Sequence, residues 1–222
     1  MAKADTEQMI LTDPLVNLRP SNYSLSRACF NSEALREVVL LLSGRSDPSR
    51  ADPGRPAGVS PQLFEFVRVF QKRADPNAVE NLWQFARRLV NSEVGREDEQ
   101  ILAYRFADWA VSEIAPLELE AQAQHVAAQR LRAQAPMVNR ETATRAMLAV
   151  DQASRLITGS NSATASAYAA AFSANNSTAK GILASSAHAA EASFFAEAAG
   201  VDRKLLTRMR LNLLDQLCPT EL

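Results

Sequence analysis

The histidines and cysteines limit the acid–base, nucleophilic and metal chemistry open to this chain, because there are so few of them. The 222 residues include two histidines, His125 and His188, and two cysteines, Cys29 and Cys218. A serine or cysteine hydrolase needs a base within hydrogen-bond reach of its nucleophile, and the sequence has neither a G-x-S-x-G turn nor a cysteine-protease signature. We therefore expect no catalytic residues and predict that the protein is not an enzyme.

One spacing in the sequence is typical of a metal site. His188 and Glu191 lie three residues apart and would share a helical face, in the inverse order of the Glu-x-x-His motif that holds iron in some helical bundles. Such centres need two copies of the motif and further glutamates, and Glu118, Glu120 and His125 do not complete the pattern. A solvent-facing pair is the favoured interpretation. We expect no metal, and because the seven scattered glycines form no phosphate-binding fingerprint, no cofactor.

Two clusters of basic residues supply the candidate contacts to phosphates or to an acidic partner. The first surrounds Pro136 and the second begins the last predicted helix. Arginine suits both kinds of contact, because its guanidinium presents a planar fork of donors. A helix face rich in arginine is more often simply solvated or paired, and no aromatic residue interleaves with either cluster in the sequence. The candidate residues are Arg130, Arg132, Arg140, Arg145, Arg203, Lys204, Arg208 and Arg210.

The composition is that of an ordinary water-soluble globular protein. Hydrophobic residues make up 47% and charged residues 22%, which argues against both disorder and a membrane protein. A net charge of -1 provides no general basic field to attract nucleic acid. Two distant cysteines and the lack of an apolar signal segment predict a cytoplasmic location. The excess of arginine over lysine and the abundant alanine fit a bacterial or phage protein.

The elements that must position these residues are predicted to be helices throughout. Capped apolar stripes recur at spacings of three and four, while no alternating β-rich run or hairpin signal is present. We therefore predict an all-α, multi-helix bundle of about eight or nine helices. The expected helices lie at about 32–43, 60–71, 75–90, 96–115, 117–134, 140–158, 160–200 as two helices divided near Asn175, and 202–217.

Proline and glycine suggest how the chain is divided. Residues 1–31 read as an irregular N-terminal arm, and 32–95 as an N-terminal helical region that contains an exposed Pro/Gly-rich loop at 44–59. Residues 96–222 form the predicted Ala-rich C-terminal helical bundle. Within it, Pro116 is expected to kink the helix or to restart it.

Helical spacing also predicts which side chains form the core. Trp83 and Trp109 are expected to be structural anchors, because each lies on the apolar face of a helix. The Ala/Ser-rich helices after residue 160 either pack tightly within one bundle or offer a smooth face to another subunit. Their bulky anchors are predicted to include Tyr168, Phe172, Phe194 and Phe195. In the last helix, the predicted inward residues are Leu205, Leu206, Met209, Leu213 and Leu217.

With catalysis set aside, the preferred function is a non-catalytic helical interaction or assembly subunit that binds another macromolecule, within a bacterial or phage multi-subunit complex. A protein partner or a homo-oligomer is expected, nucleic acid is a further candidate partner, and no membrane association is expected. One alternative is a small helical subunit of a nucleic-acid or ribonucleoprotein complex that binds phosphates through the arginine clusters. Another is a toxin-neutralising, immunity-type protein.

Overall fold

The computed structural model describes residues 58–74, 81–90, 92–157, 162–176 and 178–218. Within these ranges the chain is mostly helical and contains no strand, which confirms the predicted all-α class. The predicted arm, the predicted helix at 32–43 and the Pro/Gly-rich loop up to residue 57 lie outside them. None of the described helices combines the length and apolarity needed to cross a membrane.

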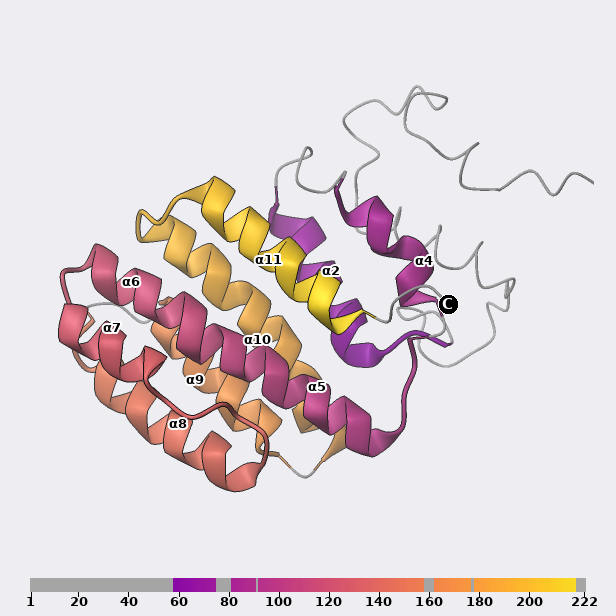
Figure 1. Ribbon diagram of the computed structural model, residues 1–222, viewed down its shortest axis with the longest axis horizontal. Coiled ribbons are helices and arrows are strands. Elements are labelled where there is room, and N and C mark those ends of the chain that lie inside the picture. The colour runs from indigo at the N-terminus through magenta and orange to yellow at the C-terminus, as the bar shows by residue number, and fades with distance from the viewer. Residues whose placement is uncertain (1–57, 75–80, 91, 158–161, 177, 219–222) are drawn as a thin grey trace, which may run out of the picture.

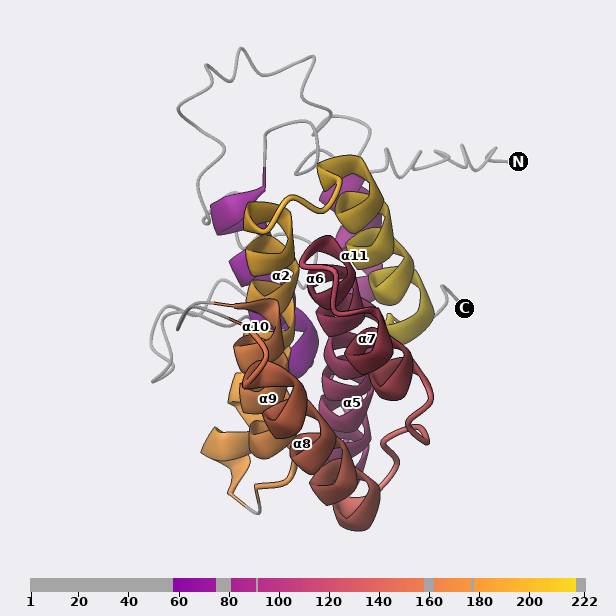
Figure 2. The same ribbon diagram turned by 90° about the vertical axis from the view of Figure 1, so that its left-hand side faces the viewer.

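One layer of the fold consists of four helices side by side. The α9 and α10 helices pack against each other at its centre, α8 covers the outer flank of α9, and α2 covers the outer flank of α10 (Figure 2). The described part of the predicted N-terminal region therefore shares its core with the C-terminal region. The four helices are α2 (Pro61–Arg73), α8 (Arg140–Ser154), α9 (Ala163–Ala174) and α10 (Ala179–Ala198).

A second set of helices lies across this layer. Its centre is a continuous helical rod that rests on α9 and α10, with α11 along one side and α7 along the other (Figure 1). The rod consists of α5 (Arg96–Trp109), a π-helical turn (Ala110–Ile114) and α6 (Ala115–Ala121), and it is flanked by α7 (His125–Arg132) and α11 (Arg203–Leu217). Counting the rod once, the described residues hold seven helices longer than one turn, so the predicted eight or nine are not confirmed.

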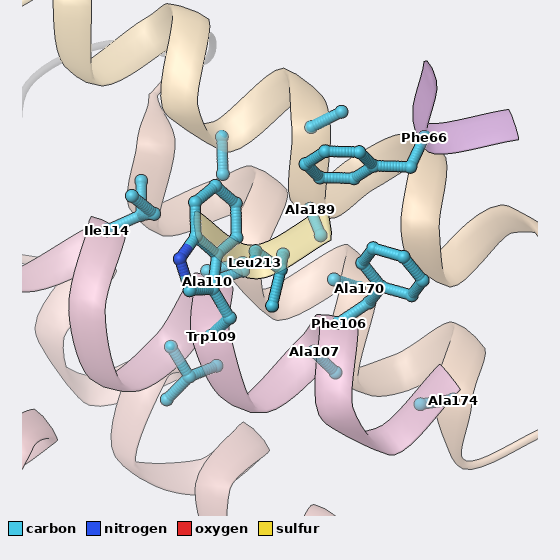
Figure 3. Packing of buried hydrophobic residues seen from close by; sticks show 14 of the residues in the cluster. Phe66, Phe106, Ala107, Trp109, Ala110, Ile114, Ala170, Ala174, Ala189 and Leu213 are labelled. Carbon is cyan, nitrogen blue, oxygen red and sulfur yellow. The ribbon is translucent and has the colours of Figure 1, made fainter. Parts of the chain in front are cut away.

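Aromatic rings fill the centre of the core. Phe66 of α2 stacks on Phe106 of α5 at a centroid separation of 4.9 Å and meets the edge of Trp109 at 5.8 Å (Figure 3). The hydrophobic cluster around them begins at Val59, which is fully buried. The last residue of the loop predicted to be exposed is thus part of the core, because it directly precedes the Ser60 cap of α2.

The segment predicted as a helix at 75–90 is broken into short pieces where it is described. A 3-10 turn (Asn81–Phe85) leads into α4 (Ala86–Leu89), a single helical turn. Leu82, Phe85 and Leu89 are buried in the common core. Trp83 was expected to be a structural anchor, but its side chain is not among those that the structure describes.

Small residues let α9 and α10 approach closely. The buried surface of α9 consists of alanine, serine and threonine, and α10 contributes buried alanines and serines in turn. The hydroxyl of Ser185 lies 3.0 Å from the carbonyl oxygens of both Ala103 and Ala170, which share its single proton, and so links α10 to both α5 and α9. The small faces therefore pack within the bundle, the first of the two interpretations given above.

Pro116 does not end its helix, because a π-helical turn precedes it. Proline has no N–H, and in a regular α-helix its ring collides with the carbonyl four residues earlier. The backbone N–H of Ala115 bonds instead to the carbonyl of Ala110, five residues back. This wider turn lets the chain continue into α6 without a break.

The helix predicted over 117–134 is interrupted at Ala123. Its φ of +59° is left-handed, a conformation that normally favours glycine. The Gln124 N–H bonds to the Leu119 carbonyl and the Ala123 N–H to the Glu120 carbonyl, which is the Schellman pattern of a helix end. Sequence propensity misses this turn because every residue around it favours a helix.

Exchanging the residues at two equivalent helix ends tests this turn. Gly200 has φ +100° and closes α10 with the same hydrogen-bond pattern, and a methyl group there would meet no neighbouring atom. We expect Ala123→Gly to raise the free energy of unfolding by about 0.5 to 1 kcal/mol and Gly200→Ala to lower it by about 1 kcal/mol. Urea denaturation measures both. Effects of the same sign would contradict the assignment of a left-handed Ala123.

Candidate interaction surfaces

The basic cluster around Pro136 is partly neutralised by neighbouring acids. Arg132 forms a two-pronged ion pair with Glu120, and Arg145 pairs with Glu141 one turn away on α8. The hydrogen bonds from Arg132 hold the pKa of Glu120 below its usual value. The other two members of the cluster, Arg130 and Arg140, are exposed. The structure therefore leaves about half of this cluster for contacts with another molecule.

The basic cluster of α11 is divided between the surface and the interior. Lys204 and Arg208 are exposed, whereas Arg210 is only 1% exposed. Arg210 thus belongs to the buried stripe of the helix, and its predicted outward position is wrong. Of the predicted inward residues, Leu206, Leu213 and Leu217 are buried, whereas Leu205 and Met209 are only half-buried. The observed stripe is Leu206, Arg210, Leu213, Leu214 and Leu217.

The buried guanidinium of Arg210 lies between α2, α10 and α11. Its centre is 3.8 Å from the ring centroid of Phe194, and its Nε donates to Ser193 Oγ at 2.7 Å. The Nη2 atom lies 3.7 Å from Glu197 Oε2 and finds no hydrogen-bond acceptor among the described residues. Burial lowers the pKa of Arg210 to about 10, although the nearby carboxylate acts in the opposite direction.

Two further arginines meet at the same place. Arg203 pairs through its Nε with Glu197, the same carboxylate that faces Arg210. Arg73, at the end of α2, lies 6.0 Å from the centroid of Phe194 and 5.5 Å from that of Phe195. We call this set, Arg73, Phe194, Glu197, Arg203 and Arg210, the arginine junction. Aromatic rings do interleave with arginines here, which the linear sequence conceals because α2 and α10 are far apart along the chain.

The His188 and Glu191 pair lies at the surface as a simple contact. The two side chains are about one-third exposed, and His188 Nδ1 is 3.4 Å from Glu191 Oε2. Within the described ranges, no three His, Cys, Asp or Glu side chains come together in a way that would hold a metal ion. In the described part of the fold, no further metal-binding side chains therefore join His188 and Glu191.

Half-buried Asp108 and buried Cys218 have structural roles. Asp108 Oδ1 accepts the backbone N–H of Met137 at 3.0 Å and so ties the α7–α8 connection to α5. Burial raises the pKa of Asp108, and burial together with the Asp108 charge raises the pKa of Glu113. Cys218 is buried beside Arg88, which donates to its carbonyl, and burial raises the pKa of its thiol to about 12. The Cys218 thiol is thus a poor candidate nucleophile, because the thiolate is the reactive form.

An apolar patch lies on the outer side of α8 and α9. The rings of Tyr168 and Phe172 stack at a centroid separation of 6.5 Å and are 37% and 54% exposed. Both were predicted to be core anchors, and that prediction is wrong, since alanines and serines take the inward positions of α9. Leu148 of α8 is 61% exposed.

Leu148 and the two rings lie on a packed pair of antiparallel helices, α8 and α9. Asn175 Nδ2 donates to Thr144 Oγ1 at 3.2 Å, which joins the end of α9 to the beginning of α8. Leu148 lies one helical turn after Thr144. In the antiparallel α9, Phe172 lies about one turn before Asn175, and Tyr168 lies one turn before Phe172. We call Leu148, Tyr168 and Phe172 the aromatic patch.

The chain matches no family model, curated protein or solved structure. The surfaces just described are therefore the basis for assigning a function. Of these, the aromatic patch is apolar and open, whereas the two basic clusters are partly paired or buried.

Proposed function

We propose that this protein is a non-catalytic helical interaction or assembly subunit and that the aromatic patch binds its protein partner. The observation that carries the proposal is the stacked, exposed pair of Tyr168 and Phe172. Large aromatic side chains are enriched among the residues that dominate binding energy, because each removes much apolar area from water at little entropic cost. A soluble helix that leaves two of them outward gains stability when a partner covers them.

The charges on α8 favour a protein over a nucleic acid. Arg145 pairs with Glu141 and Arg155 with Asp151, each one turn away on or at the end of α8. Paired guanidiniums attract phosphates less strongly than free ones, while an aliphatic Leu148 adds the kind of contact area that protein interfaces use. The partner is a different subunit of a bacterial or phage complex or a second copy of this chain.

Replacing both rings by serine tests the proposal. We expect Tyr168→Ser with Phe172→Ser to weaken binding of the partner roughly 100-fold, because two central aromatic contacts are lost. The matched control is Val126→Ser with Val138→Ser, which alters two apolar side chains of 65% and 66% exposure outside α8 and α9. Both variants should keep the wild-type helical circular dichroism, since the four side chains are exposed.

The measurement is recovery of a stoichiometric partner from native lysate, with light scattering to detect self-association. The wild type and the valine control should recover the same protein or form the same oligomer, and the ring variant should not. Equal recovery by all three proteins would contradict the patch as the binding surface. Recovery of nuclease-sensitive material in place of a protein would contradict the proposed partner class.

A further inference from the structure

We propose that the arginine junction binds carboxylate groups of an acidic protein segment and that Glu197 occupies the site until such a segment arrives. The site is built from the end of α2, the end of α10 and the first half of α11, and both α2 and α10 lie behind α11 in Figure 1. It shares no residue with the aromatic patch. The two proposals therefore stand or fall separately.

Among the described residues, the junction and its immediate neighbours hold more cationic than anionic side chains. The guanidiniums of Arg203 and Arg210 face the carboxylate of Glu197, Arg73 stacks on the adjacent rings, and Asp202 supplies the second carboxylate as the N-cap of α11. Arg73 lies against two rings and has no ion pair among the described residues. The exposed side chain of Lys204 and the positive end of the α11 dipole lie beside Arg203. A further anionic group is thus favoured at this place.

The hydrogen bonding of Glu197 suggests how an incoming carboxylate is accommodated. One oxygen of Glu197 is held by Arg203 and the other stands 3.7 Å from Nη2 of Arg210, which is beyond hydrogen-bond distance. A buried donor without an acceptor is costly. If a partner carboxylate takes over Arg203, Glu197 can turn to Arg210 and supply the missing acceptor. One hydrogen-bonded ion pair is then exchanged for two.

The exposure of the groups fits this exchange. The Arg203 side chain is 62% exposed and that of Glu197 is 19% exposed, so an incoming group meets Arg203 first. The Arg210 side chain is 1% exposed, so an incoming group does not contact it directly. Charge-assisted hydrogen bonds between guanidinium and carboxylate are strong where water is partly excluded.

The geometry favours a carboxylate over a nucleic acid. Proteins that bind single strands offer open aromatic faces on which bases stack. At the junction, Phe194 has Arg210 and Arg73 against it, and Phe195 has Arg73 against it. The net charge of -1 also gives little long-range attraction for a polyanion. An acidic polypeptide needs only the local guanidiniums.

The test measures binding of a fluorescein-labelled oligoglutamate by fluorescence anisotropy, with labelled oligouridine as the competing probe. We expect the wild type to bind oligoglutamate with an affinity that falls as salt rises. Arg203→Gln should weaken binding about tenfold, the loss of one partly buried charge-assisted contact. Glu197→Gln should strengthen it about fivefold, because the internal competitor is removed.

Two matched variants control for net charge. Arg145→Gln and Glu141→Gln make the same charge changes in an exposed pair on α8 and should alter the affinity less than twofold. Arg73→Gln is the second test variant if Glu197→Gln does not fold, and it should weaken binding. The Tyr168→Ser, Phe172→Ser protein should bind the probe like the wild type, which separates this site from the aromatic patch.

Three results would overturn the proposal. The first is an equal response to the junction variants and to their α8 controls. The second is stronger binding of oligouridine than of oligoglutamate, which would assign the junction to nucleic acid. The third is the absence of any salt-sensitive binding of oligoglutamate by the folded wild-type protein.

Discussion

Replacing Trp109 by alanine is expected to lower the free energy of unfolding by about 3 to 5 kcal/mol. The indole is 4% exposed, meets the edge of Phe66 at 5.8 Å and lies close to Ile114, Ala110 and Leu213 (Figure 3). Alanine would leave a cavity at the point where α2, α5 and α11 meet. The alanines on α9 and α10 cannot fill it, because their side chains have no rotamers through which to reach inward.

Ile101→Ala is the matched control for Trp109→Ala. It removes a large apolar side chain from the same helix, but Ile101 is 49% exposed, and we expect a cost of less than about 1 kcal/mol. Thermal denaturation followed by circular dichroism measures both variants. For a chain of this size, Trp109→Ala should lower the melting temperature by about 6 to 20 °C. A Trp109→Ala melting temperature equal to that of the control would contradict the central place of this ring.

The helix starts could be predicted because their signals are local. Ser60 followed by Pro61 begins α2, Asn139 begins α8 with a reciprocal bond to Thr142, and Asp202 begins α11. Each cap side chain accepts a backbone N–H within its own first turn. The predicted division of the Ala-rich region lies at another local feature, the Asn175–Asn176 pair between α9 and α10.

Local sequence signals could not predict the turns inside the expected helices. The residues around Ala123 all favour a helix, and the chain turns there so that Leu119 and Leu131 can both be buried. Pro116 gave a clear signal, but the sequence could not distinguish a break from a π-helical turn. Tertiary packing decides both cases.

Which residues of the candidate sites are buried and which are exposed depended still more on tertiary structure. Arg210 has the residue type of a surface contact but the position of a buried one. The rings of Phe70 and Phe194 and the hydroxyl of Ser193, which come from other helices, stabilise it there. Tyr168 and Phe172 are outward because close packing of α9 against α10 leaves room only for small side chains between them. Burial preference alone predicts the reverse.

Glu118 makes a contribution to stability that the sequence did not indicate. Its side chain is 2% exposed and lies at the beginning of α9. It accepts the backbone N–H groups of Ala163 at 2.9 Å and Thr164 at 2.8 Å, and the Thr164 hydroxyl at 2.7 Å. The Ser162 side chain accepts the next amide, that of Ala165. The first three amides of α9 are thus satisfied, two of them by a carboxylate from α6.

Replacing Glu118 by alanine is expected to cost about 2 to 4 kcal/mol, because two buried amides and a hydroxyl lose their acceptor. Loss of the negative charge at the positive end of the α9 dipole adds to this cost. Glu118→Gln keeps one acceptor oxygen but points an amide at the remaining donors, so its cost should be smaller. The order of stability should be wild type, Gln and then Ala.

Glu120→Ala is the matched control, because Glu120 lies two residues along the same helix and its ion pair with Arg132 is at the surface. Exposed pairs contribute about 0 to 1 kcal/mol, so this variant should remain close to the wild type in urea denaturation. Hydrogen exchange adds a local test, since the amides of Ala163 and Thr164 should lose protection in Glu118→Ala and keep it in Glu120→Ala. An equally small loss of stability in both variants would contradict the role of Glu118 at the start of α9. Removing the acceptor of three buried donors must cost more than removing one surface ion pair.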